Sequence, residues 1–175
     1  MRNFILFIII IISCTLSLNS QVTSRLTIYS GDAVNFNFQL LDHYQNGVSY
    51  INWTHLTVFF EDLGDPLREW KLSVEAMTPN IQGDAGNLLP LNTIEFEISG
   101  DDPLATYNNN AGNAVLSQAP NRNLVENGQQ TTVPGILTNL FISWHCGKSV
   151  YVPNSLIGSR SDYYYVEVMF TLGPE

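Results

Sequence analysis

The chain has 175 residues, the length of one domain, and 7 basic against 16 acidic residues give it a formal net charge of -9. Hydrophobic residues make up 45% of the sequence, which excludes an intrinsically disordered chain. The acidic balance also argues against binding to nucleic acid or to an anionic membrane surface, because both require a surplus of Lys and Arg.

The first twenty residues are typical of a secretory signal. Arg2 carries a positive charge, residues 5–12 form an unbroken apolar run, and a polar stretch follows up to Ser20. The run is too short for a transmembrane helix, which needs about 20 apolar residues. We predict cleavage near Ser20 and a single domain over residues 21–175, secreted or held on the outer cell surface, with no transmembrane span.

A lipid anchor is the alternative outcome of processing. The sequence Ile-Ile-Ser-Cys at residues 11–14 fits a lipobox, in which Cys14 is lipidated and becomes the first residue of the mature chain. Acyl chains on Cys14 would then hold the domain at a bilayer.

Apolar and polar residues alternate with a period of two along most of the mature chain, which predicts strands with one buried face. The N-terminal stretch 22–28 alternates in this way, and it either pairs within its own sheet or is donated to the open sheet of a neighbouring copy. Residues 101–130 are predicted to form a long connection with one or two poor strands. The other predicted strands lie at residues 34–40, 56–60, 70–76, 94–98, 140–144 and 164–172.

Turn residues separate these strands, including the Asn46-Gly47 pair, residues 83–87 and residues 126–128. No segment shows the period of an amphipathic helix over three turns. The pattern predicts an all-β fold, a single antiparallel two-sheet sandwich of the Ig-like or pilin-like kind. A closed antiparallel β-barrel would give the same alternation and is the alternative. Trp70 and Trp144 fall in register with the inward stripes, so we expect both in the core.

The residues that carry most enzyme chemistry are not in catalytic patterns. His43, His55 and His145 lack the spacing of a zinc site. His145 precedes Cys146, but adjacent strand residues point to opposite faces and cannot form a Cys-His dyad. We expect no catalytic residues, no enzymatic activity and no cofactor. We also expect Cys146 to be buried.

Two groups of residues are candidates for binding. Asp101 and Asp102 lie in an oxygen-rich loop of the kind that holds Ca²⁺, although turn aspartates also bond their own backbone. Four aromatic residues fall outside the core stripes and could stack on sugar rings, or simply pair across strands. They are Trp53, Phe141, Tyr163 and Tyr165.

Three segments carry a resemblance to a known group of proteins: residues 70–74 (WKLSV), residues 89–94 (LPLNTI) and residues 161–168 (SDYYYVEV). Over residues 70–172 the chain resembles the single-domain β-sandwiches of bacterial surface and fimbrial proteins, including the pilin-like and spore-coat-U-like group. It departs from classical fimbrial subunits in lacking their early disulfide pair. The resemblance implies a non-enzymatic structural or adhesion protein that assembles with copies of itself or with protein partners at the cell surface. The alternative function is a carbohydrate-binding module or adhesin tip, with glycans as ligands of the exposed aromatic residues.

Overall fold

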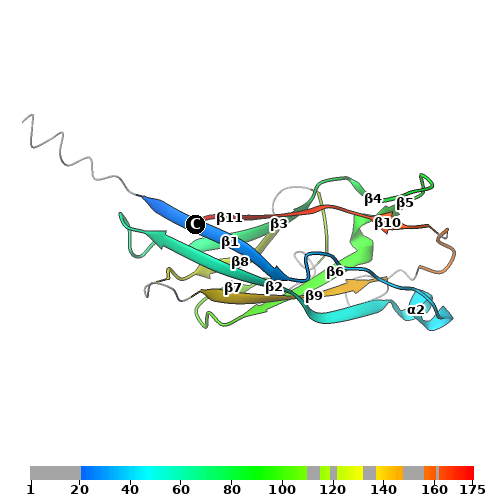
Figure 1. The fold of residues 1–175 in the computed structure, drawn as a ribbon, viewed down its shortest axis with the longest axis horizontal. Coiled ribbons are helices and arrows are strands. Elements are labelled where there is room, and N and C mark those ends of the chain that lie inside the picture. The colour runs from blue at the N-terminus through cyan, green and yellow to red at the C-terminus, as the bar shows by residue number, and fades with distance from the viewer. Residues whose placement is uncertain (1–20, 110–114, 119–121, 132–136, 148–155, 161) are drawn as a thin grey trace, which may run out of the picture.

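The structure, a computed structural model, describes residues 21–109, 115–118, 122–131, 137–147, 156–160 and 162–175. The predicted signal segment and Cys14 lie outside the described residues. The described chain is mostly β-structure in three antiparallel sheets, so the all-β prediction is confirmed (Figure 1). Each sheet runs from one edge strand to another, and the described strands therefore form no closed barrel.

Two sheets have four strands each and the third has three. The first sheet has the order β1 (Val22–Ser30), β2 (Val48–Asp62), β9 (Thr138–Cys146), β6 (Ile94–Gly100). The second has the order β11 (Val168–Pro174), β3 (Trp70–Ala76), β8 (Arg122–Gly128), β7 (Thr106–Tyr107). The third has the order β10 (Tyr164–Tyr165), β4 (Asn80–Gly83), β5 (Leu88–Pro90). A short helix α2 (Leu41–Asn46) and a 3₁₀ turn η1 (Leu91–Thr93) complete the described elements.

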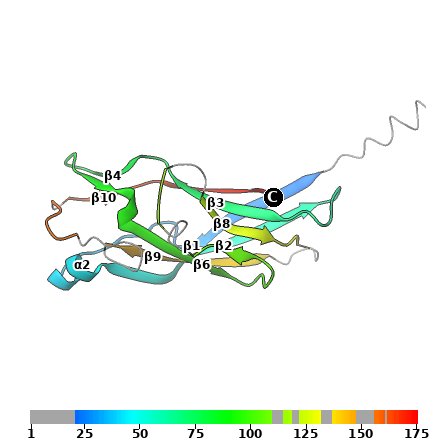
Figure 2. The same cartoon turned by 180° about the vertical axis from the view of Figure 1, so that it is seen from behind.

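The molecule is elongated along its strands. The third sheet and α2 lie at one end, and the start of β1 and the C-terminus lie toward the other, as Figures 1 and 2 both show. Strand β2 is long enough to follow most of this length: its second half pairs with β1, and its first half runs beyond β1 toward α2.

The two four-stranded sheets bury their inward stripes in one apolar cluster. Trp70 is fully buried and Trp144 is 6% exposed, which confirms the prediction for both indoles. Trp70 Nε1 donates to Gln129 O at 2.8 Å and Trp144 Nε1 donates to Thr54 Oγ1 at 2.9 Å. Burial of the two indoles therefore leaves no unsatisfied N–H. The cluster draws on both sheets, with Leu56, Val58, Leu140 and Ile142 from the first and Leu72, Val74, Leu124 and Val125 from the second.

Residues 34–40 do not form the predicted strand. Val34, Phe36 and Phe38 are half-buried against the core while the polar residues between them are exposed, as the alternation predicts. However, the segment has no ladder with β2, whose register shifts at a bulge containing Asn52 in a left-handed conformation (φ 50°). Alternation of apolar and polar residues indicates an extended chain with one packed face. It does not indicate that the main chain is hydrogen-bonded to a neighbouring strand.

Residues 122–128 belong to the stretch predicted as a long connection with one or two poor strands, and they form the inner strand β8 of the second sheet. The sequence pair Asn127-Gly128, read as a turn, lies in this strand where the β3–β8 register shifts. Asn127 has a φ of 54°, which suits a bulge as well as it suits a turn.

The last predicted stripe, residues 164–172, splits between two sheets. Its alternation of half-buried and exposed residues is continuous, but Tyr164 and Tyr165 pair with β4 while residues 168–174 pair with β3. This division creates the third sheet, which a two-layer prediction does not include.

Candidate functional site

Strand β1 is the least buried of the long strands. Eight of its nine residues are exposed, and it is an edge strand of the first sheet. Leu63 N donates to Gln21 O, which extends the β1–β2 register and makes this a hydrogen-bonded pair. Hydrogen-bonded and non-bonded pairs alternate in an antiparallel ladder. The main-chain groups of residues 22, 24, 26 and 28 therefore point away from β2, toward the free edge.

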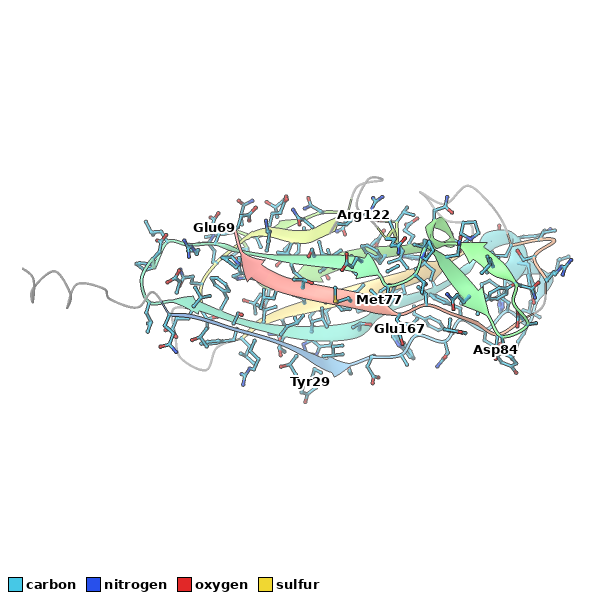
Figure 3. All side chains as sticks on the ribbon, turned by 90° about the horizontal axis from the view of Figure 1, so that it is seen from above. Tyr29, Glu69, Met77, Asp84, Arg122 and Glu167 are labelled. Carbon is cyan, nitrogen blue, oxygen red and sulfur yellow. The ribbon has the colours of Figure 1, made fainter. Side chains whose placement is uncertain are left out.

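The free edge of β1 lies beside a second edge. Strand β11, the edge strand of the second sheet, runs near β1 on the same side of the molecule (Figure 1). Figure 3 shows Tyr29 directed away from the ribbon at the end of β1, and its side chain is 75% exposed. Within the described part of the chain, this side of the molecule presents two strand edges without a strand partner, and such edges are known sites for addition of a further strand.

The opposite edge of the first sheet is covered. On β6, Ile98 N donates to Asn109 Oδ1 at 2.7 Å and Asn109 Nδ2 donates to Ile98 O at 2.8 Å, so one side-chain amide replaces a strand partner. Leu116 N donates to Ile94 O at 3.0 Å, next to a bridge between Glu95 and Val115. Among the strands that the structure describes, the first sheet thus has one protected edge and one free edge.

The four predicted sugar-binding residues do not form one surface. Phe141 on β9 stacks on His55 with ring centroids 4.6 Å apart. The ring centroids of Trp53 and Tyr50, both on β2, are 5.0 Å apart. Tyr165 belongs to β10 of the third sheet and Tyr163 directly precedes that strand; they are 55% and 85% exposed. All four avoid full burial, and Tyr163 and Tyr165 lie two residues apart in the chain.

The predicted calcium ligands Asp101 and Asp102 have different protein partners. Both carboxylate oxygens of Asp101 accept hydrogen bonds from Asn139, at 2.9 and 2.6 Å. Asp102 accepts from the backbone N–H groups of Leu104 and Gln129, at 2.9 and 2.8 Å. Calcium binding by Asp101 and Asp102 stays a prediction. Both carboxylates already accept hydrogen bonds from the protein.

His145 and Cys146 point to opposite faces of the sheet, as the strand geometry predicts. Cys146 is 7% exposed within the core, and burial raises the pKa of its thiol to about 12. A thiol in this state is neither a nucleophile nor a metal ligand near neutral pH.

On the other face of the sheet, His145 has polar neighbours on both sides. The register places Ser49 of β2 and Glu95 of β6 directly opposite it, and Glu97 follows on the same face of β6. One ligand atom from each of Glu95, Glu97 and His145 lies within 4.8 Å of the others, and we call these three residues the His145 cluster. Glu95 is 1% exposed, whereas Glu97 is exposed.

The two nitrogens of the His145 ring have different environments. Nδ1 lies 2.6 Å from Ser49 Oγ. Nε2 is inaccessible to solvent and has no hydrogen-bond partner among the described residues. Ser49, His145 and Glu95 are the residue types of a Ser-His-Glu triad. In a triad the ring nitrogen that does not face the serine donates its N–H to the carboxylate, and Nε2 of His145 makes no such hydrogen bond to any described residue.

Histidine spacing along the chain does not predict this cluster, because its residues come from strands far apart in the sequence. The only local signal is the Glu-x-Glu spacing at residues 95 and 97, which places both carboxylates on one face of a strand.

The chain matches no protein-family model and no curated protein. The resemblance to bacterial surface proteins therefore stays a prediction. Among the described residues, no helix has the length and apolar character needed to cross a membrane.

Proposed function

We propose that this protein is an exported, non-enzymatic structural or adhesion subunit that associates with copies of itself through the free edge of β1. The observation that carries the proposal is the contrast between the two edges of the first sheet. An edge strand is normally shortened, charged or covered to prevent association. Strand β1 has nine residues, no proline and a single charged residue, Arg25, while the β6 edge is covered.

The proposed fold is a two-layer sandwich extended by the small third sheet. The shared apolar cluster between the four-stranded sheets supports this arrangement. It agrees with the resemblance to fimbrial and spore-coat-U-like surface proteins. Because β1 pairs with β2 of its own chain, association would add a strand to the edge and would not require β1 to leave its sheet.

The test uses the direction of the Ser24 main chain. The Ser24 N–H points away from β2, so Ser24→Pro removes a donor from the free edge without breaking the β1–β2 ladder. Ser24→Thr keeps the N–H and is the matched control. In sedimentation velocity experiments over rising concentration, we expect wild type and Ser24→Thr to associate and Ser24→Pro to remain monomeric. A wild-type protein that stays monomeric at high concentration and does not bind the producing cells would contradict the proposal.

Export is tested separately by the intact mass of the protein from its native host, with cell and medium fractions compared. A mass beginning at Gln21, in the medium or on the outer surface, would support release by cleavage. A mass beginning at an acylated Cys14 would make the protein a lipid-anchored one. An unprocessed chain in the cytoplasm would contradict both forms of the proposal.

Glycan binding is the second candidate, and the exposure of Tyr163 and Tyr165, on either side of Tyr164 at the start of β10, favours it. Tyr165 OH lies 3.4 Å from Gln82 Oε1, so a ring and an amide are adjacent, as in sugar-binding sites. A glycan array is expected to give a signal that Tyr163→Ala and Tyr165→Ala abolish and that Tyr29→Ala leaves intact. An array without signal, or with a signal unchanged by the first two variants, would rule this function out.

A further inference from the structure

We propose that Glu95, Glu97 and His145 bind one divalent transition-metal ion, with Zn²⁺ as the best fit. The inference begins with the strand register. Glu95 and His145 are cross-strand partners on β6 and β9, and Glu97 is two residues further along the same face. Two rigid neighbouring strands therefore hold all three side chains, so little conformational freedom is lost when a ligand binds.

The electrostatics of the His145 cluster favour a cation. Two carboxylates and an imidazole bring ligand atoms within 4.8 Å of one another, and the Glu95 side chain is withdrawn from solvent. Like charges at this separation repel, and burial of one of them reduces screening by water. A divalent ion between the carboxylates would neutralise both.

The unpartnered Nε2 atom of His145 is the second, independent observation. Buried polar atoms in proteins nearly always have a hydrogen-bond partner, so an exception needs an explanation. Nε2 is buried without a partner among the described residues, and its ring belongs to the cluster that holds the two carboxylates. A metal ion bonded to the Nε2 lone pair would supply the missing partner.

Ser49 prepares the imidazole for this role. With the ring proton on Nδ1, His145 donates to Ser49 Oγ at 2.6 Å and leaves the Nε2 lone pair free. Metal-binding histidines usually donate their other ring N–H to a fixed acceptor in this way. Ser49 is therefore a positioning residue, opposite His145 in the β2–β9 ladder.

The ligand types select the metal. One imidazole nitrogen and two carboxylates suit Zn²⁺, whose open sites have three protein ligands and a water. Ca²⁺ takes six to eight oxygen ligands and no imidazole, so the cluster is a poor site for it. Glu97 is exposed, which gives an ion a path from solvent.

The experiment titrates Zn²⁺, and separately Ca²⁺, into the full mature protein purified without a metal-binding tag and treated with a chelator. We expect isothermal titration calorimetry to show one Zn²⁺ per chain and no Ca²⁺ binding at the same concentrations. Glu97→Gln and His145→Gln should each weaken Zn²⁺ binding by about 100-fold, and Ser49→Ala by about 10-fold, as expected for a residue that only orients a ligand. His43→Gln and Glu167→Gln are matched controls outside the three strands that carry the cluster and Ser49, and both should bind as wild type does: His43 lies in α2 and Glu167 between β10 and β11.

Three results would overturn the metal site: no Zn²⁺ binding by the wild-type protein, binding unchanged by Glu97→Gln, or equal binding of Ca²⁺. Glu97 is exposed, so its variant tests the site even if replacing the half-buried His145 impairs folding. Circular dichroism of each variant establishes that it is folded. The readout does not depend on association through β1, so either proposal can fail alone.

Discussion

At the scale of single residues, side-chain direction decides chemistry more than residue type does. His145 and Cys146 are adjacent on β9, yet one belongs to a polar cluster and the other to the apolar core. Alternation along a strand separates them by the thickness of the sheet. His145 and Cys146 are therefore neighbours in the sequence but lie in two separate environments in the structure.

The buried thiol gives a prediction for chemical labelling. A chain cleaved near Ser20, as proposed, has Cys146 as its one cysteine, and burial raises the pKa of this thiol from an ordinary value of 9.0 to about 12. Because only the thiolate reacts, labelling by iodoacetamide at pH 8 should be about 1,000-fold slower in the native protein than in guanidinium chloride. Native labelling within about tenfold of the unfolded rate would show that the thiol is accessible.

The same shift predicts the direction of a pH effect on stability. The pKa of Cys146 is raised on folding, so the folded protein binds this proton more tightly than the unfolded chain does. Its contribution to the free energy of unfolding is fully present below about pH 9 and is lost as the pH rises toward about 12. In urea unfolding over this range, Cys146→Ser should lose less stability than wild type, relative to each protein at pH 7. An equal or steeper loss in the variant would contradict the shift.

Gly128 is a second single-residue prediction. A methyl group at this position would overlap the indole of Trp70, whereas one at Gly173 would meet no atom within 4 Å. Gly128→Ala should therefore lower the free energy of unfolding by about 1–3 kcal/mol, because the fully buried indole cannot shift freely. Urea unfolding followed by tryptophan fluorescence measures the change, with Gly173→Ala as control. Equal stability of the two variants would contradict this packing.

At the scale of elements, side chains form hydrogen bonds with main-chain groups that no neighbouring strand pairs with. Asn109 covers the main chain of β6, and the Asp162 carboxylate holds the turn between β4 and β5. Each of these contacts joins two segments that are separated in the sequence, so the local sequence around either segment does not predict the contact. A Cβ at Gly83, the last residue of β4, would overlap the Asp162 carboxylate in its present position, so a larger residue there would displace this carboxylate.

Asp162 predicts a pH-dependent turn. Burial acts to raise the pKa of its carboxyl, but hydrogen bonds from Asn87, Ala85 and Tyr163 outweigh it and hold the pKa below the ordinary value of 3.8. A depressed pKa stabilises the folded turn above that ordinary value, and this support is lost as the pH falls through the lower folded value. The Ala85 amide proton, which donates to this carboxylate, should therefore titrate in NMR spectra with a midpoint below 3.8. A midpoint at or above 3.8, or a titration that persists in Asp162→Asn, would contradict the clamp.

At the scale of the whole molecule, the two four-stranded sheets depend on one core. Leu72 of β3 and Leu140 of β9 are both fully buried in it, although they belong to different sheets. A sheet with one apolar face is unstable unless that face is covered, so neither sheet can keep its structure after the other unfolds.

This dependence predicts cooperative unfolding. Leu72→Ala and Leu140→Ala should each lower the free energy of unfolding by about 2–5 kcal/mol while leaving a single transition. Leu67→Ala is the matched control, because Leu67 is 89% exposed and its loss should change stability by less than about 0.5 kcal/mol. Calorimetry together with near-UV circular dichroism would detect the two separate transitions that contradict a shared core.

The sequence by itself determined the all-β class, the buried stripes of β3, β6 and β9 and the burial of both core tryptophans, because alternation is a local property of each strand. It also determined the opposite directions of His145 and Cys146. The turn at residues 83–87 was likewise evident from its glycines and asparagine, and the structure places it between β4 and β5.

Only the tertiary structure decided how the strands pair. The division of the last stripe between two sheets, the inner position of β8 and the free edge of β1 depend on partners far away in the chain. The His145 cluster depends on the same pairing, since β2, β6 and β9 bring Ser49, Glu95 and His145 to one level of the sheet. Strand register is a relation between distant segments and is set by the packing of all of them together. The periodicity within one segment therefore does not predict it.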